Sequence, residues 1–218
     1  MKIIVNGYNI EFDPSKPIKT NDGETIPTFE GIVVSYDGWD KDLEIPDEIE
    51  VEKAFEVTAK DKFTEVKLEN KSKVIVTSID ISAFENYIYA EKVKIPETVK
   101  TIGKFAFKKC LSLKYVYVPG SVKEIPDYCF INCKALEKID FNEGLKKIGD
   151  YSFSGCEKLS SVSIPSGCYH IGFSCFEKCR ILRTVEFPKD FNINKVDYFA
   201  FKYSGFEKKF ADMLDNKK

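Results

Sequence analysis

Apolar and polar positions follow one repeating order along the second half of the chain. The unit that begins IPETVKTIGKFAFKKCLSLKYVY at Ile95 recurs at a constant step, and its later copies start at Val118, Phe141, Ile164 and Phe187. A short fixed period is typical of a solenoid, in which a repeat cannot bury its own apolar side and must stack on its neighbours. The pattern therefore predicts a stack of similar coils.

Each repeat contains one stretch with the pattern of a strand. It ends in an apolar–polar–apolar alternation, as in Val116-Tyr117-Val118, which is typical of a half-buried strand. Proline usually follows, and the strand ends there because proline lacks the N–H that a strand ladder needs. One strand per repeat, all running the same way, predicts a parallel sheet.

Two kinds of core residue recur at fixed positions of the repeat. A stack of rings along the solenoid is predicted for Phe107, Phe130, Phe153, Phe176 and Phe201. The seven cysteines also lie in repeat columns: Cys110, Cys133, Cys156 and Cys179 in one, with Cys129, Cys168 and Cys175 in two others. We interpret the cysteines as small buried apolar side chains. A redox- or metal-responsive cysteine ladder is the less favoured alternative.

The repeat decays toward both ends, which predicts three parts. Residues 1–44 are expected to form an N-terminal β-rich cap, because Asn6-Gly7 between two apolar runs is a hairpin signal. Residues 45–94 are expected to hold degenerate repeats, with Ile45-Pro46 and Ala54-Phe55 in one of them, and residues 95–206 hold the five regular ones. Residues 207–218 are expected to form a capping helix after the capping box Ser204-x-x-Glu207. Trp39, beside a turn, is expected to cover the end of the core.

The unit IP-x-x-V-x-x-IG-x-x-AF-x-x-C-x-x-L-x-x-V resembles the BspA-like, or Treponema-type, leucine-rich repeat over roughly residues 29 to 206. The resemblance implies an α/β fold: a right-handed leucine-rich-repeat solenoid with a curved parallel sheet, an N-terminal β cap and a C-terminal helical cap. It also implies a bacterial or protist protein, often exposed on the surface and associated with adhesion and protein binding.

Charge and hydropathy exclude some partners and suggest a location. The 33 basic and 35 acidic residues leave a net charge of −2, which gives no general attraction to nucleic acid or to an anionic membrane. No apolar run reaches about 18 residues, so no membrane span is predicted. The first residues, MKIIVNGYNIEF, lack a signal-peptide pattern. They predict a cytoplasmic protein; a cell-surface or secreted protein is the alternative if a leader is missing from the sequence.

Candidate chemistry is sparse. His170, the single histidine, lies in a polar column and is expected at the surface. A catalytic base needs a positioned nucleophile and an orienting partner, and the repeat supplies neither. The cysteine spacings differ from those of zinc sites, which favour C-x2-C pairs. We therefore predict no enzyme activity, no catalytic or metal-binding residue and no cofactor.

The polar positions of the repeated strands form the predicted binding surface, because a period of two places them on the exposed side of the sheet. Tyr115 and Tyr117 lie in the middle and are candidate central contacts. The alternative is that these tyrosines merely favour strand formation. In chain order the exposed positions are expected to be Glu65, Lys67, Lys92, Lys94, Tyr115, Tyr117, Lys138, Asp140, Ser161, Ser163, Thr184 and Glu186.

Together these features predict a non-catalytic module that binds a protein or peptide on the exposed sheet, with a role in adhesion. A structural element that self-assembles through its ends or its sheet edges is the alternative. The mixed charges of the exposed positions argue against a nucleic-acid groove, which would be almost entirely basic. The sequence specifies neither the partner nor the oligomeric state.

Overall fold

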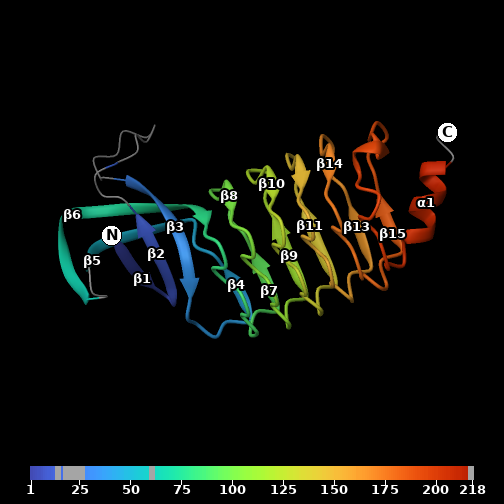
Figure 1. Ribbon diagram of the computed structural model, residues 1–218. Coiled ribbons are helices and arrows are strands. Elements are labelled where there is room, and N and C mark those ends of the chain that lie inside the picture. Colours follow the sequence, from blue (N-terminus) through green and yellow to red (C-terminus); the bar gives the residue numbers. More distant parts are fainter. Residues whose placement is uncertain (13–15, 17–27, 59–61, 216–218) are drawn as a thin grey trace.

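The chain forms an elongated stack of coils with a β-sheet unit at the N-terminal end and one helix at the C-terminal end (Figure 1). The structure is a computed structural model and describes residues 1–12, 16, 28–58 and 62–215. Each coil in the regular part contributes one longer strand on one side and one short strand on the other. The elements are therefore arranged as the solenoid prediction expects, with an additional short strand in most coils.

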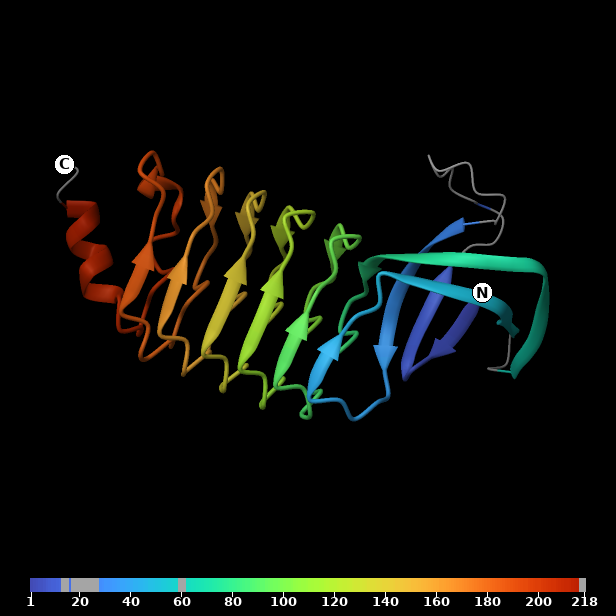
Figure 2. The ribbon, with the colours of Figure 1, turned by 180° about the vertical axis from the view of Figure 1, so that it is seen from behind.

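The longer strands form the predicted parallel sheet. Figure 2 shows them side by side in a row, pointing the same way. β7, β9 and β11 pair in parallel with partners one repeat apart, as in Lys92↔Tyr115 and Tyr115↔Lys138. β13 and β15 form a further parallel pair with the same offset. The bounds are β4 (Asp42–Glu44), β7 (Lys92–Lys94), β9 (Tyr115–Val118), β11 (Lys138–Phe141), β13 (Ser161–Ser163) and β15 (Thr184–Glu186).

The short strands line the opposite side of the coils. β10, β12 and β14 form a parallel ladder, and β8 pairs with the end of β6. In the last coil the 3-10 helix η1 (Ile193–Lys195) replaces this strand, and only Val196 bridges to Ile171. The bounds are β8 (Thr101–Ile102), β10 (Glu124–Ile125), β12 (Lys147–Ile148) and β14 (His170–Ile171).

The predicted phenylalanine stack runs through the core and also includes Phe84, one period before Phe107. Neighbouring ring centroids lie 5.0 to 5.4 Å apart and the ring planes differ by 8° or less. Every ring in the stack is buried. This continuous stack joins each coil to the next.

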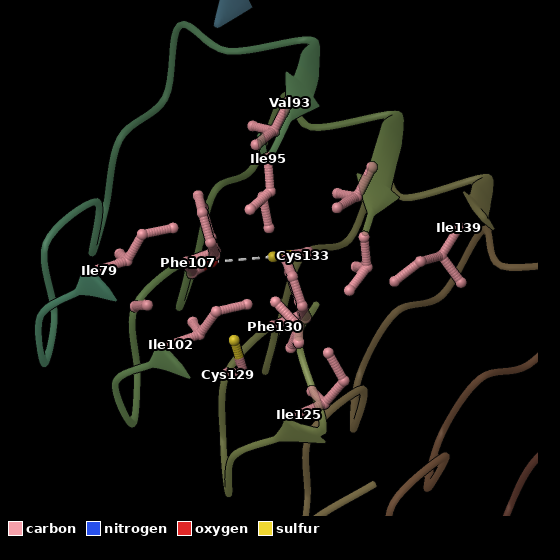
Figure 3. Close-up of a cluster of buried hydrophobic side chains, with 14 of the residues drawn as sticks. Ile79, Val93, Ile95, Ile102, Phe107, Ile125, Cys129, Phe130, Cys133 and Ile139 are labelled. Atoms are coloured by element: carbon pink, nitrogen blue, oxygen red, sulfur yellow. Dashed lines mark hydrogen bonds between the residues drawn. The ribbon is translucent and has the colours of Figure 1, made fainter. Parts of the chain in front are cut away.

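The seven cysteines are buried with free thiols, as the interpretation of the repeat columns expected. Cys133 Sγ donates to the carbonyl oxygen of Phe107 at 3.0 Å (Figure 3). Cys110, Cys156 and Cys179 make the same bond to the phenylalanine of the preceding coil. Burial raises the pKa of these last three thiols, so they remain protonated inside the core.

Five strands before the regular coils form a closed ring. The order is β3–β2–β1–β5–β6, and β6 returns to pair with β3 in parallel. The hairpin signal at Asn6-Gly7 is confirmed: both residues adopt positive φ, 49° and 84°, between β1 and β2. Ile10, Val33 and Val74 are fully buried. The bounds are β1 (Lys2–Val5), β2 (Tyr8–Phe12), β3 (Thr28–Tyr36), β5 (Glu48–Thr58) and β6 (Lys62–Ile79).

Within residues 45–94, where degenerate repeats were expected, β5 and β6 pair as an antiparallel hairpin. Paired residues of β4 and β7 are 50 residues apart in the chain, as in Asp42↔Lys92. Paired residues of β6 and β8 are 23 residues apart, which is the regular period, as in Ser78↔Thr101. The first coil is thus longer than the others by more than one whole repeat. The motifs Ile45-Pro46 and Ala54-Phe55 resemble those of the repeat, but Ala54 and Phe55 lie in β5 and pair with Val66 and Glu65 of β6.

The helix α1 (Glu207–Asp215) lies against the last coil. Ser204 Oγ accepts a hydrogen bond from the Phe206 N–H at 3.2 Å, and a Glu207 carboxylate oxygen accepts one from the Tyr203 N–H at 2.9 Å. The Phe210 ring is buried with its centroid 4.9 Å from that of Phe201, the last ring of the stack. The helix therefore covers the exposed end of the aromatic stack.

Tyrosines join the ring of strands to the first coil. The rings of Tyr8 and Tyr36 lie 4.4 Å apart, and the Tyr36 ring lies 5.3 Å from that of Tyr87. Tyr8 donates to the carbonyl oxygen of Glu44 and Tyr87 to that of Asp40, while Tyr36 donates to the Asp40 carboxylate. Burial, the largest cause, raises the pKa of all three hydroxyls, that of Tyr87 to about 12.

These raised pKa values predict alkaline destabilisation. A free tyrosine in the unfolded chain ionises near pH 10, whereas Tyr87 in the folded chain keeps its proton to about pH 12. Stability is therefore fully present below pH 10 and is lost as pH rises toward 12, with a slope of at most about 1.4 kcal/mol per pH unit for each tyrosine. Urea unfolding across this range should show the decline, and a Tyr87→Phe variant should show a shallower one. If stability fell with pH equally steeply in the Tyr87→Phe variant, Tyr87 would not be a source of the alkaline destabilisation.

Candidate functional site

The candidate site is the exposed side of the parallel sheet, here called the sheet face. In the three-residue strands of this sheet the middle residue points into the core, so β4, β7, β13 and β15 all have the exposed–buried–exposed pattern. The flanking side chains therefore lie together on one surface. The sheet face consists of Asp42, Glu44, Lys92, Lys94, Tyr115, Tyr117, Lys138, Asp140, Ser161, Ser163, Thr184 and Glu186.

The first strand of the sheet face differs from the prediction. Glu65 and Lys67 lie in β6, which pairs with β5 at these positions and not with the solenoid sheet. Asp42 and Glu44 of β4 take their place beside Lys92 and Lys94. A sequence signal for β4 exists, because Leu-Glu-Ile-Pro at residues 43–46 has the pattern of Val-Lys-Ile-Pro at residues 93–96. The inserted hairpin separates these segments by 50 residues, so the regular period does not connect β4 with β7.

Tyr115 is half-buried in the middle of the sheet face and is held from the neighbouring strand. Its hydroxyl donates to Asp140 Oδ2 at 2.9 Å. Lys138 Nζ contacts the same carboxylate oxygen at 2.9 Å and lies 5.6 Å from the centroid of the tyrosine ring. Burial and then the hydrogen bond to Asp140 raise the pKa of Tyr115. The three side chains form one connected group across β9 and β11.

Tyr117 is also half-buried, and its hydroxyl makes two hydrogen bonds. It donates to Glu97 Oε1 at 2.9 Å and accepts from Asn142 Nδ2 at 3.2 Å. The hydrogen bond to Glu97 is the largest cause that raises the pKa of Tyr117. Both tyrosines of the candidate centre are therefore positioned by neighbouring side chains, with part of each ring open to solvent.

The charges at the ends of the sheet face are unequally paired. Lys92 Nζ lies 3.3 Å from Asp42 Oδ1, and Ser163 Oγ donates to Glu186 Oε2 at 2.6 Å. Among the residues that the structure describes, no ion-pair partner contacts Glu44 or Lys94. A shallow depression of about 250 Å³ lies over β4, β7 and β9, with Asp42, Lys94 and Tyr115 in its lining. The sheet face is thus hollowed most clearly toward its N-terminal side.

The other candidate residues lie away from the sheet face. His170 is half-buried in β14, on the opposite side of the coil. Within the described ranges, no group of three histidine, cysteine, aspartate or glutamate side chains is arranged to hold a metal ion. Trp39 does not cover the core: it is 73% exposed, and its ring is tilted by 60° against that of Tyr89 with centroids 4.7 Å apart.

The repeated strand, the phenylalanine stack and the parallel sheet define a leucine-rich-repeat solenoid. The chain belongs to the family of the BspA type leucine rich repeat region, and six copies of that repeat match residues 77–207. The family resemblance noted from the sequence is therefore confirmed. In the parts of the chain that are described, no helix is long and apolar enough to cross a lipid bilayer.

Solved structures with the same fold come from bacteria. A leucine-rich cell surface protein from Faecalibacterium prausnitzii has a TM-score of 0.61 and 24% identity, over 88% of this chain and 44% of its own. The T. pallidum leucine rich repeat protein has a TM-score of 0.63 and 22% identity, over 85% and 71% of the two chains. A leucine-rich repeat protein from Eubacterium ventriosum has a TM-score of 0.55 and 28% identity, over 61% and 36%.

This chain thus spans less than half the length of the F. prausnitzii and E. ventriosum proteins. None of these three proteins is named as an enzyme. A comparison with curated proteins gives no match.

Proposed function

We propose that this chain is a non-catalytic interaction module that binds a protein or peptide on the sheet face. The observation that carries the proposal is the positioning of Tyr115 and Tyr117. Hydrogen bonds to Asp140 and Glu97 hold the two hydroxyls before any partner binds. Side chains that are already ordered lose little freedom on binding, and aromatic residues inside a polar rim are typical of binding hot spots.

We further propose that the chain acts at a cell surface, with adhesion as its role. The F. prausnitzii protein, which shares the fold, is named a cell surface protein. This name supports the surface alternative over the cytoplasmic interpretation of the sequence. A solenoid also suits adhesion because its extended surface meets a partner at several coils together.

Affinity capture tests the binding proposal. The purified chain and a Tyr115→Ala/Tyr117→Ala variant are immobilised and exposed to lysate and surface fractions of the source organism. We expect a partner that the native chain retains and the variant loses, with affinity reduced at least about tenfold, because a hot-spot tyrosine contributes about 2 kcal/mol or more.

A matched control removes the same number of tyrosines at other positions. Tyr169 and Tyr198 are 59% and 71% exposed and lie outside the strands of the sheet face. A Tyr169→Ala/Tyr198→Ala variant should therefore retain the partner. Circular dichroism must show that all three proteins are equally folded. Equal retention by both variants would show that the sheet-face tyrosines are not the contacts.

A further inference from the structure

The sheet face continues past β4 into a larger groove between the first coil and the β1–β2 hairpin. This joint groove has a volume of about 550 Å³. Val5 and Tyr8 line it from the hairpin, and Pro46 and Ile49 line it from the segment after β4. Ile49 is buried at the base, so part of the lining is apolar. The groove exists because the β5–β6 hairpin is inserted into the first coil and places the ring of strands beside it.

The joint groove is continuous with the depression on the sheet face. Asp42 and Glu44 line both hollows, and Tyr115 lies at the far side of the depression. A single concave path therefore leads from the β1–β2 hairpin across β4 and β7 to β9. A chain segment lying across the strands would contact the groove and the tyrosines together.

The groove is acidic. Among the described residues, its lining contains no lysine or arginine and five carboxylic acids, Asp40, Asp42, Glu44, Glu48 and Glu50. Lys92 pairs with Asp42 and Lys73 pairs with Glu48, but within the described part of the chain no cation pairs with Glu44 or Glu50. The N-terminal part of the chain also carries a negative net charge, because residues 1–80 contain 18 aspartates and glutamates and 10 lysines. The chain as a whole is nearly neutral.

An exposed aromatic pair lies beside the groove. Trp39 directly precedes Asp40 in the chain, is 73% exposed and contacts the Tyr89 ring at a tilt of 60°. The faces of tryptophan and tyrosine rings attract lysine and arginine side chains. The aromatic pair and the unpaired carboxylates thus favour the same kind of group by two different interactions.

We propose that the joint groove receives a lysine or arginine side chain of the partner, on an extended segment that continues to Tyr115 and Tyr117. This inference rests on the proposed function and names the chemistry of the partner. β4 and β9 are two strand spacings apart, or about 10 Å. An extended chain advances about 3.3 Å per residue, so the basic residue lies roughly three residues from the one that contacts the tyrosines.

A displayed library of random short peptides provides the probe. The library is selected on the native chain, and enriched peptides are synthesised and measured by fluorescence anisotropy. Three variants are compared: Glu44→Gln/Glu50→Gln in the groove, Tyr115→Ala/Tyr117→Ala on the sheet, and Glu137→Gln/Asp190→Asn as a control. The control also removes two exposed carboxylates, at positions outside the groove and the sheet face.

We expect enriched peptides to carry lysine or arginine about three residues from an apolar or aromatic residue. The groove variant and the tyrosine variant should each weaken binding at least about tenfold, and the control should not. Added salt should weaken binding to the native chain more than binding to the groove variant.

Other outcomes separate the two proposals. Peptides that depend on the tyrosines but lack a basic residue, or that bind the groove variant normally, would overturn this inference and leave the proposed function in place. The failure of any peptide to depend on either site would overturn both. Because Glu44 and Glu50 are exposed and have no ion partner among the described residues, the glutamine variant should fold normally, which circular dichroism checks.

Discussion

Replacing Phe153 with alanine should lower the free energy of unfolding by about 3 to 5 kcal/mol. The ring is fully buried in the middle of the stack, with centroids 5.2 Å from Phe130 and 5.3 Å from Phe176. Its loss leaves a cavity that the neighbouring rings cannot fill, because each belongs to a different coil with its own backbone position. Urea unfolding followed by circular dichroism measures the change.

The break in the stack should also reduce cooperativity. In a solenoid each coil contacts only its neighbours, so weakened coupling at one coil separates the segments on either side. We therefore expect a smaller dependence of the unfolding free energy on urea, or two transitions in place of one. Phe173→Ala is the matched control, since Phe173 is 38% exposed and lies outside this stack. A loss below about 1 kcal/mol for Phe153→Ala would mean that the stack is not the core.

Replacing Gly103 with alanine should destabilise the protein by about 3 kcal/mol, although only one methyl group is added. A Cβ at this position would lie 2.5 Å from the carbonyl carbon and 2.7 Å from the carbonyl oxygen of Asp80 in the preceding coil. The Gly103 N–H also donates to the carbonyl oxygen of Ile79 at 2.8 Å. Relief of the clash would require two adjacent coils to separate and would weaken this bond.

Thermal and urea unfolding of Gly103→Ala should be compared with Lys104→Ala in the same turn. The second change removes an exposed ion pair with Asp127 at 2.8 Å and leaves the backbone contact intact. Exposed ion pairs contribute about 1 kcal/mol or less, so the control should be nearly neutral. Similar stability of the two variants would show that the coils can separate at this turn without cost.

The regular coils were predictable because every copy of the repeat buries apolar side chains at the same positions. The positions of Phe107 and Phe153 in the stack, and of Tyr115 and Tyr117 on the sheet, follow from the period and from the alternation along a strand. The hydrogen bonds of those tyrosines were not predictable, because they depend on which rotamers the neighbouring side chains adopt. The strand β4, which is the first strand of the sheet face, was not predicted because the inserted hairpin breaks the period of the repeat.

A second aromatic stack also escaped prediction. Phe105 and Tyr128 lie with ring centroids 5.1 Å apart, and Tyr151 continues the row at 5.1 Å, outside the core. All three have positive φ, 61°, 61° and 54°. Bulky residues seldom adopt this conformation, which favours glycine and asparagine. Conformational preferences of the residues would therefore not predict aromatic side chains at these positive-φ positions.

The inserted hairpin makes the two ends of the solenoid topologically different. At the C-terminal end the chain leaves the last coil once and covers it with α1. At the N-terminal end it crosses between the solenoid and the ring of strands three times: from β3 into β4, from β4 into β5, and from β6 back into the first coil. The two halves of the first coil, β4 and the end of β6, are separated in the chain by the β5–β6 hairpin. Fraying of the array begins at either end of a simple solenoid, and here we expect it to begin at the C-terminal end.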